Sequence, residues 1–245
     1  MPVMIVTGTG TEIGKTVVTA AVAAAALTQG RTVAVLKPAQ TGLRPDETGD
    51  AAEVARLAGA VTTAELARFP DPLAPATAAR RAGAAPVHPH TVAVAAEKLA
   101  AEHDLVLVEG AGGLLVRFDE SGGTLAEAAQ LLEAPVLVVA PAGLGTLNAT
   151  ALTAEALRSR SLALLGVVVG SWPAAPDLAA RCNLTDLPEA AGAPLLGAVP
   201  EGVGALAPEV FRERAASWLA PGLDGCWDGA GFVAEVGSGA AFGSA

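Results

Sequence analysis

The sequence predicts an α/β fold in which a doubly wound, mostly parallel sheet is flanked by helices. Short continuous apolar runs, which are typical of strands buried on both faces, alternate with helix-like segments along most of the chain. A glycine-rich loop directly follows the first of these runs and precedes an alanine-rich segment. Ligands of such sheets bind at the carboxyl ends of the strands, so the polar residues at those ends are the first candidates for a site.

Six apolar runs are the expected strands. Each is bounded by polar, glycine or proline residues and has the length of a strand buried on both faces. The expected strands are residues 3–6, 31–38, 104–113, 135–140, 162–170 and 194–200.

Helix-like segments fill the intervals between these runs. A stretch rich in proline and alanine, 70–89, predicts a loop and a short helix over the sheet edge, without a role that the sequence assigns. The expected helices are residues 17–27, 50–59, 91–102, 124–132, 147–159, 177–191 and 208–219.

The length of the chain fits one domain. A chain of 245 residues can bury a core on both faces of one sheet. We expect a single domain over residues 1–220. Glycine, alanine and serine dominate the remaining tail, 221–245, where Trp227, Phe232 and Phe242 are scattered without a clear period. The tail is therefore predicted to be poorly ordered.

The loop after the first strand has the composition of a phosphate-binding loop. It runs from Val6 to Thr16 and ends in Gly-Lys-Thr. Backbone N–H groups of such a loop turn inward around an anion, its lysine reaches the outer phosphates and its hydroxyl coordinates Mg²⁺. The usual spacing would place its first glycine at Thr9, between Gly8 and Gly10. An ordinary strand-to-helix turn is the alternative, but the flanking glycines, strand and helix favour a P-loop NTPase-like fold.

Charged residues follow two of the buried runs. Lys37 precedes Pro38, which holds it in place, so its ammonium can stabilise developing negative charge; an ordinary surface lysine is the alternative. Glu109 follows Leu-Val-Leu-Val and is placed to hold Mg²⁺ beside the loop, unless it is exposed in a flexible turn. Asp50 is either the N-cap of a helix or a second carboxylate on the metal.

Composition excludes several kinds of partner. Apolar residues make up 52% of the chain, yet no uninterrupted apolar run approaches the roughly 20 residues that cross a bilayer, so no membrane partner is expected. Lys and Arg total 15 against 25 Asp and Glu, a net charge of −10, which is a poor surface for nucleic acid. The basic start of a secretory signal is missing, which predicts a cytoplasmic protein.

Cysteines and histidines give no metal-binding pattern. Cys182 and Cys226 lie far apart, so we expect buried or inert thiols and neither a disulfide nor a zinc site. The sequence His88-Pro-His90 has no third ligand nearby, and a solvated turn is favoured over a metal pair.

Five stretches follow the order and spacing of one known family. They are Thr7-Gly-Thr-Gly-Thr-Glu-Ile-Gly-Lys-Thr16, Lys37-Pro-Ala-Gln-Thr-Gly42, Glu109-Gly-Ala-Gly-Gly113, Leu144-Gly-Thr-Leu-Asn148 and Leu196-Gly-Ala-Val-Pro200. The sequence resembles the dethiobiotin synthetases of the biotin pathway. The resemblance covers residues 1–220 and leaves the tail outside it.

The resemblance implies an ATP- and Mg²⁺-dependent cyclo-ligase that acts on 7,8-diaminononanoate and CO₂. One amine captures CO₂ as a carbamate, whose oxygen attacks the γ-phosphate of the nucleoside triphosphate to give a carbamic-phosphoric anhydride. The second amine closes the cyclic urea of dethiobiotin and expels phosphate, leaving ADP. This reaction is the penultimate step of biotin biosynthesis, with ATP as co-substrate.

The resemblance also implies a role for each matching residue. Phosphoryl transfer to a carbamate brings two anions together, so positive charge has to flank the transition state. The expected catalytic residues are Lys37, Lys15 and Thr11, and the expected metal ligands are Thr16, Asp50 and Glu109. The expected nucleotide-binding residues are Glu12, Ile13, Gly14, Lys15, Thr16, Val17, Asp50, Glu109, Gly110, Ala111, Gly112, Gly170, Ser171, Pro200, Glu201 and Gly202. The expected substrate-binding residues are Thr41, Thr11, Gly112, Gly113, Gly145, Thr146, Leu147 and Asn148.

The family is homodimeric, which implies a substrate site shared across the subunit interface. The substrate carboxylate is expected at the helix start near Gly145 of the neighbouring subunit, where Asn148 can cap the helix.

One departure from the family's pattern concerns recognition of the nucleotide base. Many members have Asn-Asp after the fifth strand, where this chain has Gly170-Ser171-Trp172. The amide that would read the base is missing, so we expect a relaxed base preference, with backbone groups at Gly170 and 200–202 contacting the base.

Two other classes of protein compete with this interpretation. Partitioning and metal-cluster-assembly ATPases carry an extra lysine near the start of the loop, whereas this chain has Gly10, Thr11 and Glu12 there. A nucleotide-binding regulatory module that has lost the reaction would lose residues such as Lys37 and Glu109 first. Their presence favours an enzyme.

Overall fold

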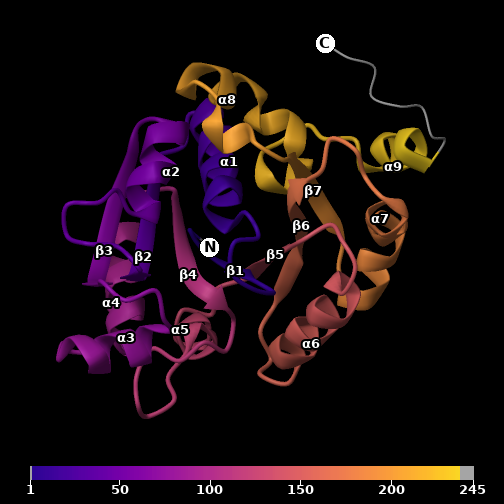
Figure 1. Cartoon of the computed structure of the whole chain (residues 1–245). Coiled ribbons are helices and arrows are strands. Elements are labelled where there is room, and N and C mark those ends of the chain that lie inside the picture. The colour runs from indigo at the N-terminus through magenta and orange to yellow at the C-terminus, as the bar shows by residue number, and fades with distance from the viewer. Residues whose placement is uncertain (1, 238–245) are drawn as a thin grey trace.

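The structure, a computed structural model, describes residues 2–237; residues 1 and 238–245 lie outside the described part. A seven-stranded sheet in the order β3-β2-β4-β1-β5-β6-β7 forms its centre, and every neighbouring pair of strands is parallel (Figure 1). The strands are β1 Val3–Gly8, β2 Val33–Thr41, β3 Val61–Phe69, β4 Leu105–Gly113, β5 Val136–Ala140, β6 Leu164–Trp172 and β7 Leu195–Pro200.

Helices connect the strands and cover both faces of the sheet (Figure 1). No helix in the described part of the chain is long and apolar enough to span a membrane. The α-helices are α1 Lys15–Thr28, α2 Asp50–Ala58, α3 Pro75–Ala82, α4 Pro89–Ala100, α5 Leu125–Leu131, α6 Thr146–Arg158, α7 Leu178–Ala191, α8 Pro208–Ala215 and α9 Gly229–Gly237. The 3₁₀ segments are η1 Val203–Ala205, η2 Ala216–Trp218 and η3 Pro221–Leu223.

Alternation along the central strands divides the core into two layers. Val35 and Leu107 pack with α1, α2 and α8 on one face, whereas their neighbours Leu36 and Val108 pack with α3, α4 and α5 on the other. Side chains of successive strand residues point to opposite faces, which accounts for this division. These strands are therefore apolar without interruption because both of their faces are covered, which confirms the predicted doubly wound α/β class.

The prediction of six strands is wrong, because β3 was not recognised. Its sequence contains Thr62, Thr63, Glu65 and Arg68, which interrupt the apolar pattern. The strand lies at the edge of the sheet, pairs only with β2 and is half-exposed over most of its length. An edge strand can carry polar side chains that a central strand of a parallel sheet cannot.

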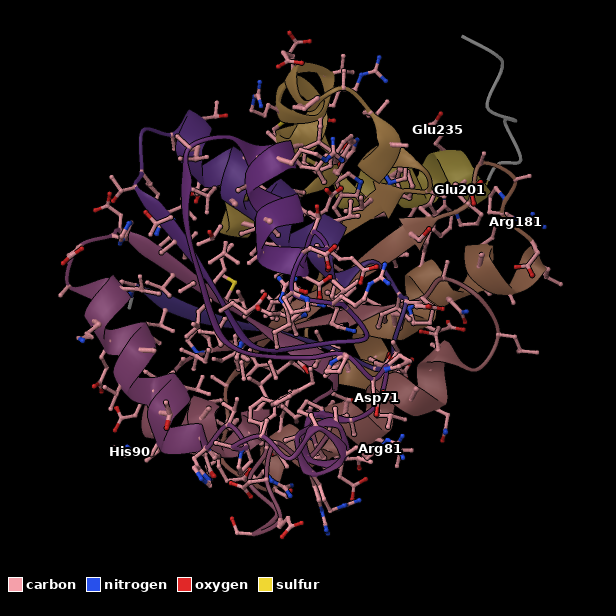
Figure 2. The ribbon with its side chains drawn as sticks, turned by 60° about the vertical axis from the view of Figure 1, so that its left-hand side comes forward. Asp71, Arg81, His90, Arg181, Glu201 and Glu235 are labelled. Atoms are coloured by element: carbon pink, nitrogen blue, oxygen red, sulfur yellow. The ribbon has the colours of Figure 1, made fainter. Side chains whose placement is uncertain are left out.

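Two stretches without an assigned role have defined structure. Within the stretch 70–89, the short helix α3 follows a loop, as predicted, and the Arg81 guanidinium forms an ion pair of 2.5 Å with Asp71 that joins helix and loop (Figure 2). The sequence predicts poor order from residue 221 onward, whereas 221–237 forms η3 and α9. The Phe232 ring of α9 packs edge-on against Trp172 with ring centroids 5.5 Å apart; residues 238–245 of the tail, including Phe242, lie outside the described part.

The sheet opens at the carboxyl ends of its central strands. The β2–β4 ladder ends at the pair Leu36 and Val108, while β2 continues beside β3 as far as Thr41. Lys37 and Glu109 are thus the first residues beyond the ladder. The strand order also reverses around β1, which lies between β4 and β5, and such switch points are where open α/β sheets form their ligand crevice.

Candidate active site

The glycine-rich loop joins β1 to α1, and its backbone is fixed by a close contact. Gly14, the N-cap of α1, has φ 90°, and a Cβ there would lie 2.2 Å from the carbonyl oxygen of Gly170 on β6. No other residue type fits that position. The contact places the first turn of α1, beginning at Lys15, at the carboxyl edge of the sheet, where its unpaired N–H groups and positive dipole end form an anion site.

Lys15 lies over this loop and is almost wholly buried, with 7% of its surface exposed. Its Nζ donates a hydrogen bond of 2.7 Å to the carbonyl oxygen of Gly10. Burial lowers the pKa of Lys15, and the nearby positive charge of Lys37 lowers it further. The lysine is therefore aimed across the concave side of the loop, and an anion bound there would favour its charged form.

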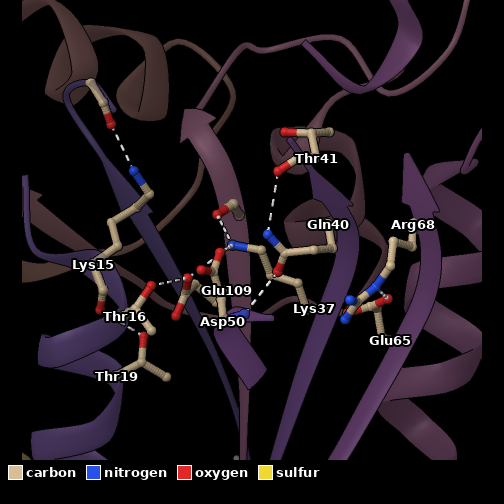
Figure 3. Close-up of polar contacts among 12 residues, drawn as sticks. Lys15, Thr16, Thr19, Lys37, Gln40, Thr41, Asp50, Glu65, Arg68 and Glu109 are labelled. Atoms are coloured by element: carbon tan, nitrogen blue, oxygen red, sulfur yellow. Dashed lines mark hydrogen bonds and ion pairs between the residues drawn. The ribbon is translucent and has the colours of Figure 1, made fainter. Parts of the chain in front are cut away.

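A buried cluster faces Lys15 from β2, β4 and α2 (Figure 3). Lys37 Nζ lies 2.9 Å from Glu109 Oε1 and 2.5 Å from Asp50 Oδ2, and it also donates to the carbonyl oxygen of Gly110 at 3.1 Å. Thr16 Oγ1 donates to the same Glu109 oxygen at 2.9 Å. The phosphate loop therefore meets the lysine of β2 and the two carboxylates at one place.

Burial and charge pull the pKa of Lys37 in opposite directions. Burial, at 3% exposure, disfavours the ammonium, but the carboxylates of Glu109 and Asp50 outweigh it and raise the pKa of Lys37 above its ordinary value. The lysine is thus cationic at neutral pH and held by its partners. The alternative of a surface lysine is wrong, and so is that of an exposed Glu109, which is 1% exposed inside β4.

The donor set fits a magnesium ion. The second carboxylate oxygen of Glu109, Oε2, is buried without a hydrogen-bond partner among the described residues, which leaves one oxygen for a cation. Two carboxylates and a hydroxyl beside a phosphate site are the hard oxygen ligands that Mg²⁺ takes, the remainder being phosphate oxygens and water. This donor set contains only two carboxylates, and no group of three or more His, Cys, Asp or Glu side chains among the described residues could hold a metal ion.

These groups line a cleft of about 760 Å³, within the usual range for small-ligand sites. The cleft brings together most of the residues expected at the loop, the metal and the substrate. The expected residues that line it are Thr11, Glu12, Ile13, Gly14, Lys15, Thr16, Val17, Lys37, Thr41, Asp50, Glu109, Ala111 and Gly112.

The other expected residues lie outside this cleft. Gly110 and Gly113 belong to the same β4 segment, and Gly170 contacts the loop backbone at Ile13 and Gly14. Ser171 is exposed at the end of β6, and Glu201 N donates to the carbonyl oxygen of Trp172. The remaining positions lie at the ends of β6 and β7, just after β7, or at the start of α6, and they are Ser171, Pro200, Glu201, Gly202, Gly145, Thr146, Leu147 and Asn148.

Two expected helix caps are corrected. Gly145 is the N-cap of α6 and Asn148 lies inside the first turn, so Asn148 does not cap the helix. Gly49, not Asp50, is the N-cap of α2. Asp50 occupies the first helical position instead, and its side chain turns to Lys37. In both cases the helix begins one or more residues earlier than it would if the polar side chain were the N-cap.

Several residues of the cleft were missed. Gln40 is buried there, and its Oε1 accepts a hydrogen bond of 2.8 Å from the backbone N–H of Asp50. The signal was available, because Gln40 stands in the Lys37–Gly42 motif itself. The apolar wall of Leu43, Pro72 and Leu73 had no motif, and only the proline-rich composition of the stretch 70–89 hinted at a shaped loop.

The remaining candidates lie apart from the cleft. His88 is the N-cap of α4, and its Nδ1 lies 2.8 Å from Oδ2 of the buried Asp119. His88 and His90 are both exposed, so the stretch is solvated as predicted, but it begins a helix and is anchored by Asp119. Cys182 and Cys226 are both free thiols, as expected; both are exposed, so of the two expected alternatives, buried or inert thiols, the structure contradicts burial.

Comparison with known proteins agrees with this geometry. A family model described as an AAA domain matches residues 3–205. In folded shape, the chain is similar to a ParA family ATPase from Chlorobium tepidum TLS, with a TM-score of 0.56 and 13% identity over 91% of this chain and 96% of that one. The cell division ATPase MinD of Pyrococcus furiosus gives a TM-score of 0.54 and 19% identity over 88% and 97% of the two chains. At such low identity these likenesses show the P-loop NTPase fold alone.

Sequence comparison is more specific. A protein of Streptomyces coelicolor named ATP-dependent dethiobiotin synthetase BioD is 73% identical over 95% of this chain and 98% of its own length. A protein of the same name from Saccharopolyspora erythraea is 69% identical over 93% of this chain and 99% of its own. One from Mycobacteroides abscessus is 49% identical over 90% and 96%. The loop, the paired lysines and these near full-length identities lead to one conclusion: the chain belongs to the family of ATP-dependent dethiobiotin synthetases.

Proposed function

We propose that this chain is the ATP-dependent cyclo-ligase that converts 7,8-diaminononanoate and CO₂ into dethiobiotin, with ADP and phosphate as the other products. The observation that carries the proposal is the convergence of Lys15, Lys37, Thr16 and Glu109 in one cleft. The enzyme acts in the cytoplasm, where ATP is available for biotin biosynthesis. Its domain is proposed to comprise residues 1–220, with the tail 221–245 outside the catalytic unit.

The nucleotide is assigned to the loop and the start of α1. Backbone N–H groups of residues 12–17 surround its phosphates, and Lys15 neutralises the charge of the outer ones. Thr16, Asp50 and Glu109 would hold Mg²⁺, which would supply positive charge next to the phosphates. Lys37 lies opposite Lys15, so the γ-phosphoryl group is flanked by positive charge on the side where the carbamate approaches.

The diamine is assigned to the side of the cleft beyond Lys37. Thr41 and Thr11 offer hydroxyl groups, and Gly112 exposes backbone, which together suit the amines and the carbamate. Leu43, Pro72 and Leu73 form an apolar wall that suits the alkyl chain of the substrate. Polar groups at one end and an apolar wall at the other would orient the substrate with its amines toward Lys37.

The chemistry needs proton acceptors as well as positive charge. Formation of the carbamate releases one proton, and attack of the second amine on the carbonyl carbon, with departure of phosphate, releases another. No histidine lines the cleft, and the carboxylates of Asp50 and Glu109 are paired with Lys37. We assign the second proton to an oxygen of the departing phosphate, which lies next to the attacking nitrogen.

A homodimer with a shared substrate site is part of the proposal. Leu144 is 93% exposed just before α6, and Leu152 and Leu178 are exposed on α6 and α7, which suits burial by a second copy. Asn183 of α7 donates to the carbonyl oxygens of Ala142 and Gly143 at 2.7 Å and 3.0 Å and so fixes the loop before α6. The substrate carboxylate would bind at the start of α6, near Gly145–Asn148, from the neighbouring subunit.

Incorporation of labelled bicarbonate into an acid-stable product tests the function. Purified protein, Mg-ATP and 7,8-diaminononanoate should fix the label, and omission of either ATP or diamine should abolish fixation. A partitioning ATPase would hydrolyse ATP without diamine, and a regulatory module would bind ATP without turnover. Either of these results, in protein shown by thermal denaturation to be folded, would contradict the proposal.

The oligomer is tested separately by light scattering coupled to size-exclusion chromatography. A mass of twice the 24.1 kDa chain is expected. Replacement of the exposed Leu144 and Leu152 by Asp should give monomers with reduced affinity for the diamine and unchanged affinity for ATP. A fully active monomer would contradict the shared site.

A further inference from the structure

The loop that delivers Asp50 to the cleft is held by a network that the reaction itself does not require. This loop, residues 42–49, leads from β2 to α2 and ends at Gly49. Its inner turn is closed by a hydrogen bond of 3.1 Å from the N–H of Glu47 to the carbonyl oxygen of Arg44. Asp50 follows directly, so any movement of the loop moves its carboxylate relative to Lys37 and Glu109.

Arg68 of β3 lies beside Glu65 (Figure 3), and its guanidinium contacts this turn. Its Nη1 donates to the carbonyl oxygens of Arg44 at 3.1 Å and Glu47 at 2.5 Å, the two ends of the turn. Its Nε and Nη2 donate to the two carboxylate oxygens of Glu65 at 2.7 Å and 2.8 Å. A planar guanidinium can make both sets of contacts at once, which the single ammonium of a lysine cannot.

The network reaches Asp50 through Gly49 and Gln40. A Cβ on Gly49 would lie 2.6 Å from Arg68 Nη2 and 3.1 Å from both Gln40 Oε1 and Glu65 Oε2, so the backbone of Gly49 rests directly on the three side chains. Gly49 has φ −92°, which any residue adopts, so close approach and not backbone conformation requires the glycine. Gln40 then fixes the next residue by accepting the N–H of Asp50.

The register of the sheet accounts for this arrangement. Glu65 pairs with Lys37, and Arg68 pairs with Gln40, along the β2–β3 ladder. The polar residues that kept β3 from being recognised as a strand are therefore the neighbours of the lysine motif. Arg68 and Glu65 are only partly exposed, at 22% and 23% of their side chains, and neither lines the cleft.

We propose that Arg68, oriented by Glu65, is a positioning residue that fixes Asp50 for metal binding by clamping the 42–49 loop. We call Glu65, Arg68, Gln40 and Gly49 the β3 clamp. The inference rests on the role of Asp50 as a ligand of Mg²⁺ proposed above. Residues that orient a metal ligand typically change metal affinity by about 10- to 100-fold when they are replaced.

The test measures metal binding directly, with Mn²⁺ as an electron paramagnetic resonance probe in the presence of ADP. Arg68→Gln should weaken Mn²⁺ binding about tenfold. Activity should need correspondingly more Mg²⁺, with the KM for the diamine unchanged. Hydrogen exchange at the amide of Asp50 should also become faster, because the 42–49 loop that leads into Asp50 loses its hydrogen bonds from Arg68. Arg212→Gln, which removes a partly exposed arginine paired with Glu209 at 3.0 Å on α8, is the matched control and should change none of these.

Two further variants separate geometry from charge and stability. Arg68→Lys keeps the charge without the fork and should restore little of the lost affinity; full restoration would overturn the clamp. Gly49→Ala places a methyl group against Arg68 Nη2 and should weaken Mn²⁺ binding in the same way even if Arg68→Gln is too unstable to assay. Mn²⁺ affinity within twofold of the parent in folded Arg68→Gln or Gly49→Ala would overturn the proposal.

Asp50→Asn distinguishes failure of the clamp from failure of the proposed metal site. If Asp50→Asn weakens Mn²⁺ binding and Arg68→Gln does not, the clamp is wrong and the metal ligand stands. If Asp50→Asn leaves Mn²⁺ binding unchanged, Asp50 is not a ligand, and the inference about Arg68 is overturned together with that role.

Discussion

The two halves of the sheet offer a ligand different kinds of group. On the side of β3, β2, β4 and β1, buried charged side chains meet at Lys37, which is 3% exposed and paired with Glu109 and Asp50. On the side of β5, β6 and β7, the loop meets backbone, since Gly14 lies against the carbonyl of Gly170. Side-chain charge suits phosphoryl transfer, whereas close backbone packing sets position and shape. Chemistry and placement are thus divided between the halves.

Removal of Lys37 should give the largest effect. In Lys37→Ala, the negative charge of the transition state is no longer stabilised by a fixed ammonium group, and fixation of labelled bicarbonate should fall by about 10³-fold or more. The free energy of unfolding should also fall by about 3 kcal/mol, because Glu109 stays buried without its counter-ion. Bicarbonate incorporation, at a temperature where the variant is folded, measures the loss of activity, and thermal denaturation measures the loss of stability. Lys98→Ala, at an exposed lysine of α4, is the control. Activity within tenfold of the parent would mean that side-chain charge on this half is dispensable.

Gly170→Ala probes the backbone half. A Cβ there would lie 2.1 Å from the carbonyl oxygen of Ile13, so the loop has to shift away from β6. We expect about a tenfold rise in the KM for ATP, with a smaller change in kcat, because a displaced cradle loses positioning before it loses charge. Steady-state kinetics at saturating diamine measure both constants. Gly222→Ala, where the nearest atom to a Cβ lies 4.0 Å away, should behave as the parent, and equal KM values for the two variants would remove the role of this contact.

The preference for one nucleotide base also tests the half of the sheet formed by β5, β6 and β7, and the expected effect is smaller. Ser171 is exposed at the end of β6, and Trp172 is buried against Phe232, so no side-chain amide follows β6 to read a base edge. Sites that hydrogen-bond a group reject analogues by about 10⁴-fold or more, whereas sites without such groups discriminate weakly. We expect values of kcat/KM for ATP, GTP, CTP and UTP within about tenfold of one another. Turnover with ATP alone would show that the backbone reads the base after all.

Asp119 gives the smallest expected effect and shows that polar burial alone does not make a site. Burial opposes the ionised form, but hydrogen bonds from Ser121, Gly123 and His88 outweigh it and lower the pKa of Asp119 from 3.8 to about 2. A carboxyl whose folded pKa is lowered contributes stability above its unfolded pKa and loses it as the pH falls through the folded value.

Asp119→Asn should therefore lower the free energy of unfolding by about 2 kcal/mol at pH 7. The difference from the parent should shrink as the pH falls from about 4 toward 2, the interval between the two pKa values. Urea titrations across this range measure it, with the exposed Asp186→Asn as control. Bicarbonate fixation at pH 7 should be unchanged, and a large loss of activity would place Asp119 within the catalytic half.

The difference between the halves also explains what could be predicted from the sequence. Lys15, Thr16, Lys37 and Glu109 were found because each follows a buried apolar run in a short motif, and parallel strands bring such ends together. That Lys37 would bind both Glu109 and Asp50 could not be predicted, because it depends on where the β2–β4 ladder ends.

Other features left a weaker trace or none. β3 was missed because an edge strand tolerates the polar residues that carry the clamp. The contact of Gly14 with Gly170 joins two backbone segments more than 150 positions apart. The only sign of this contact in the sequence is that both positions are glycine. Positions selected for the absence of a side chain are harder to interpret than those selected for its chemistry.

The order of the strands has a consequence for how the chain acquires its catalytic centre. β4 lies between β1 and β2, so Thr16 and Glu109, 93 positions apart, meet only after β4, which follows α4, has been inserted between two strands that were made earlier. Contacts of such high sequence separation form slowly, because the chain loses the entropy of closing the loop before the contacts can stabilise it. A nascent chain that stops short of Leu105 has the sequence of the phosphate loop but lacks both Glu109 and the Gly170 backbone against which the loop packs. During synthesis, the metal site can therefore form only after β4 is made, and the support of the phosphate loop only after β6 is made.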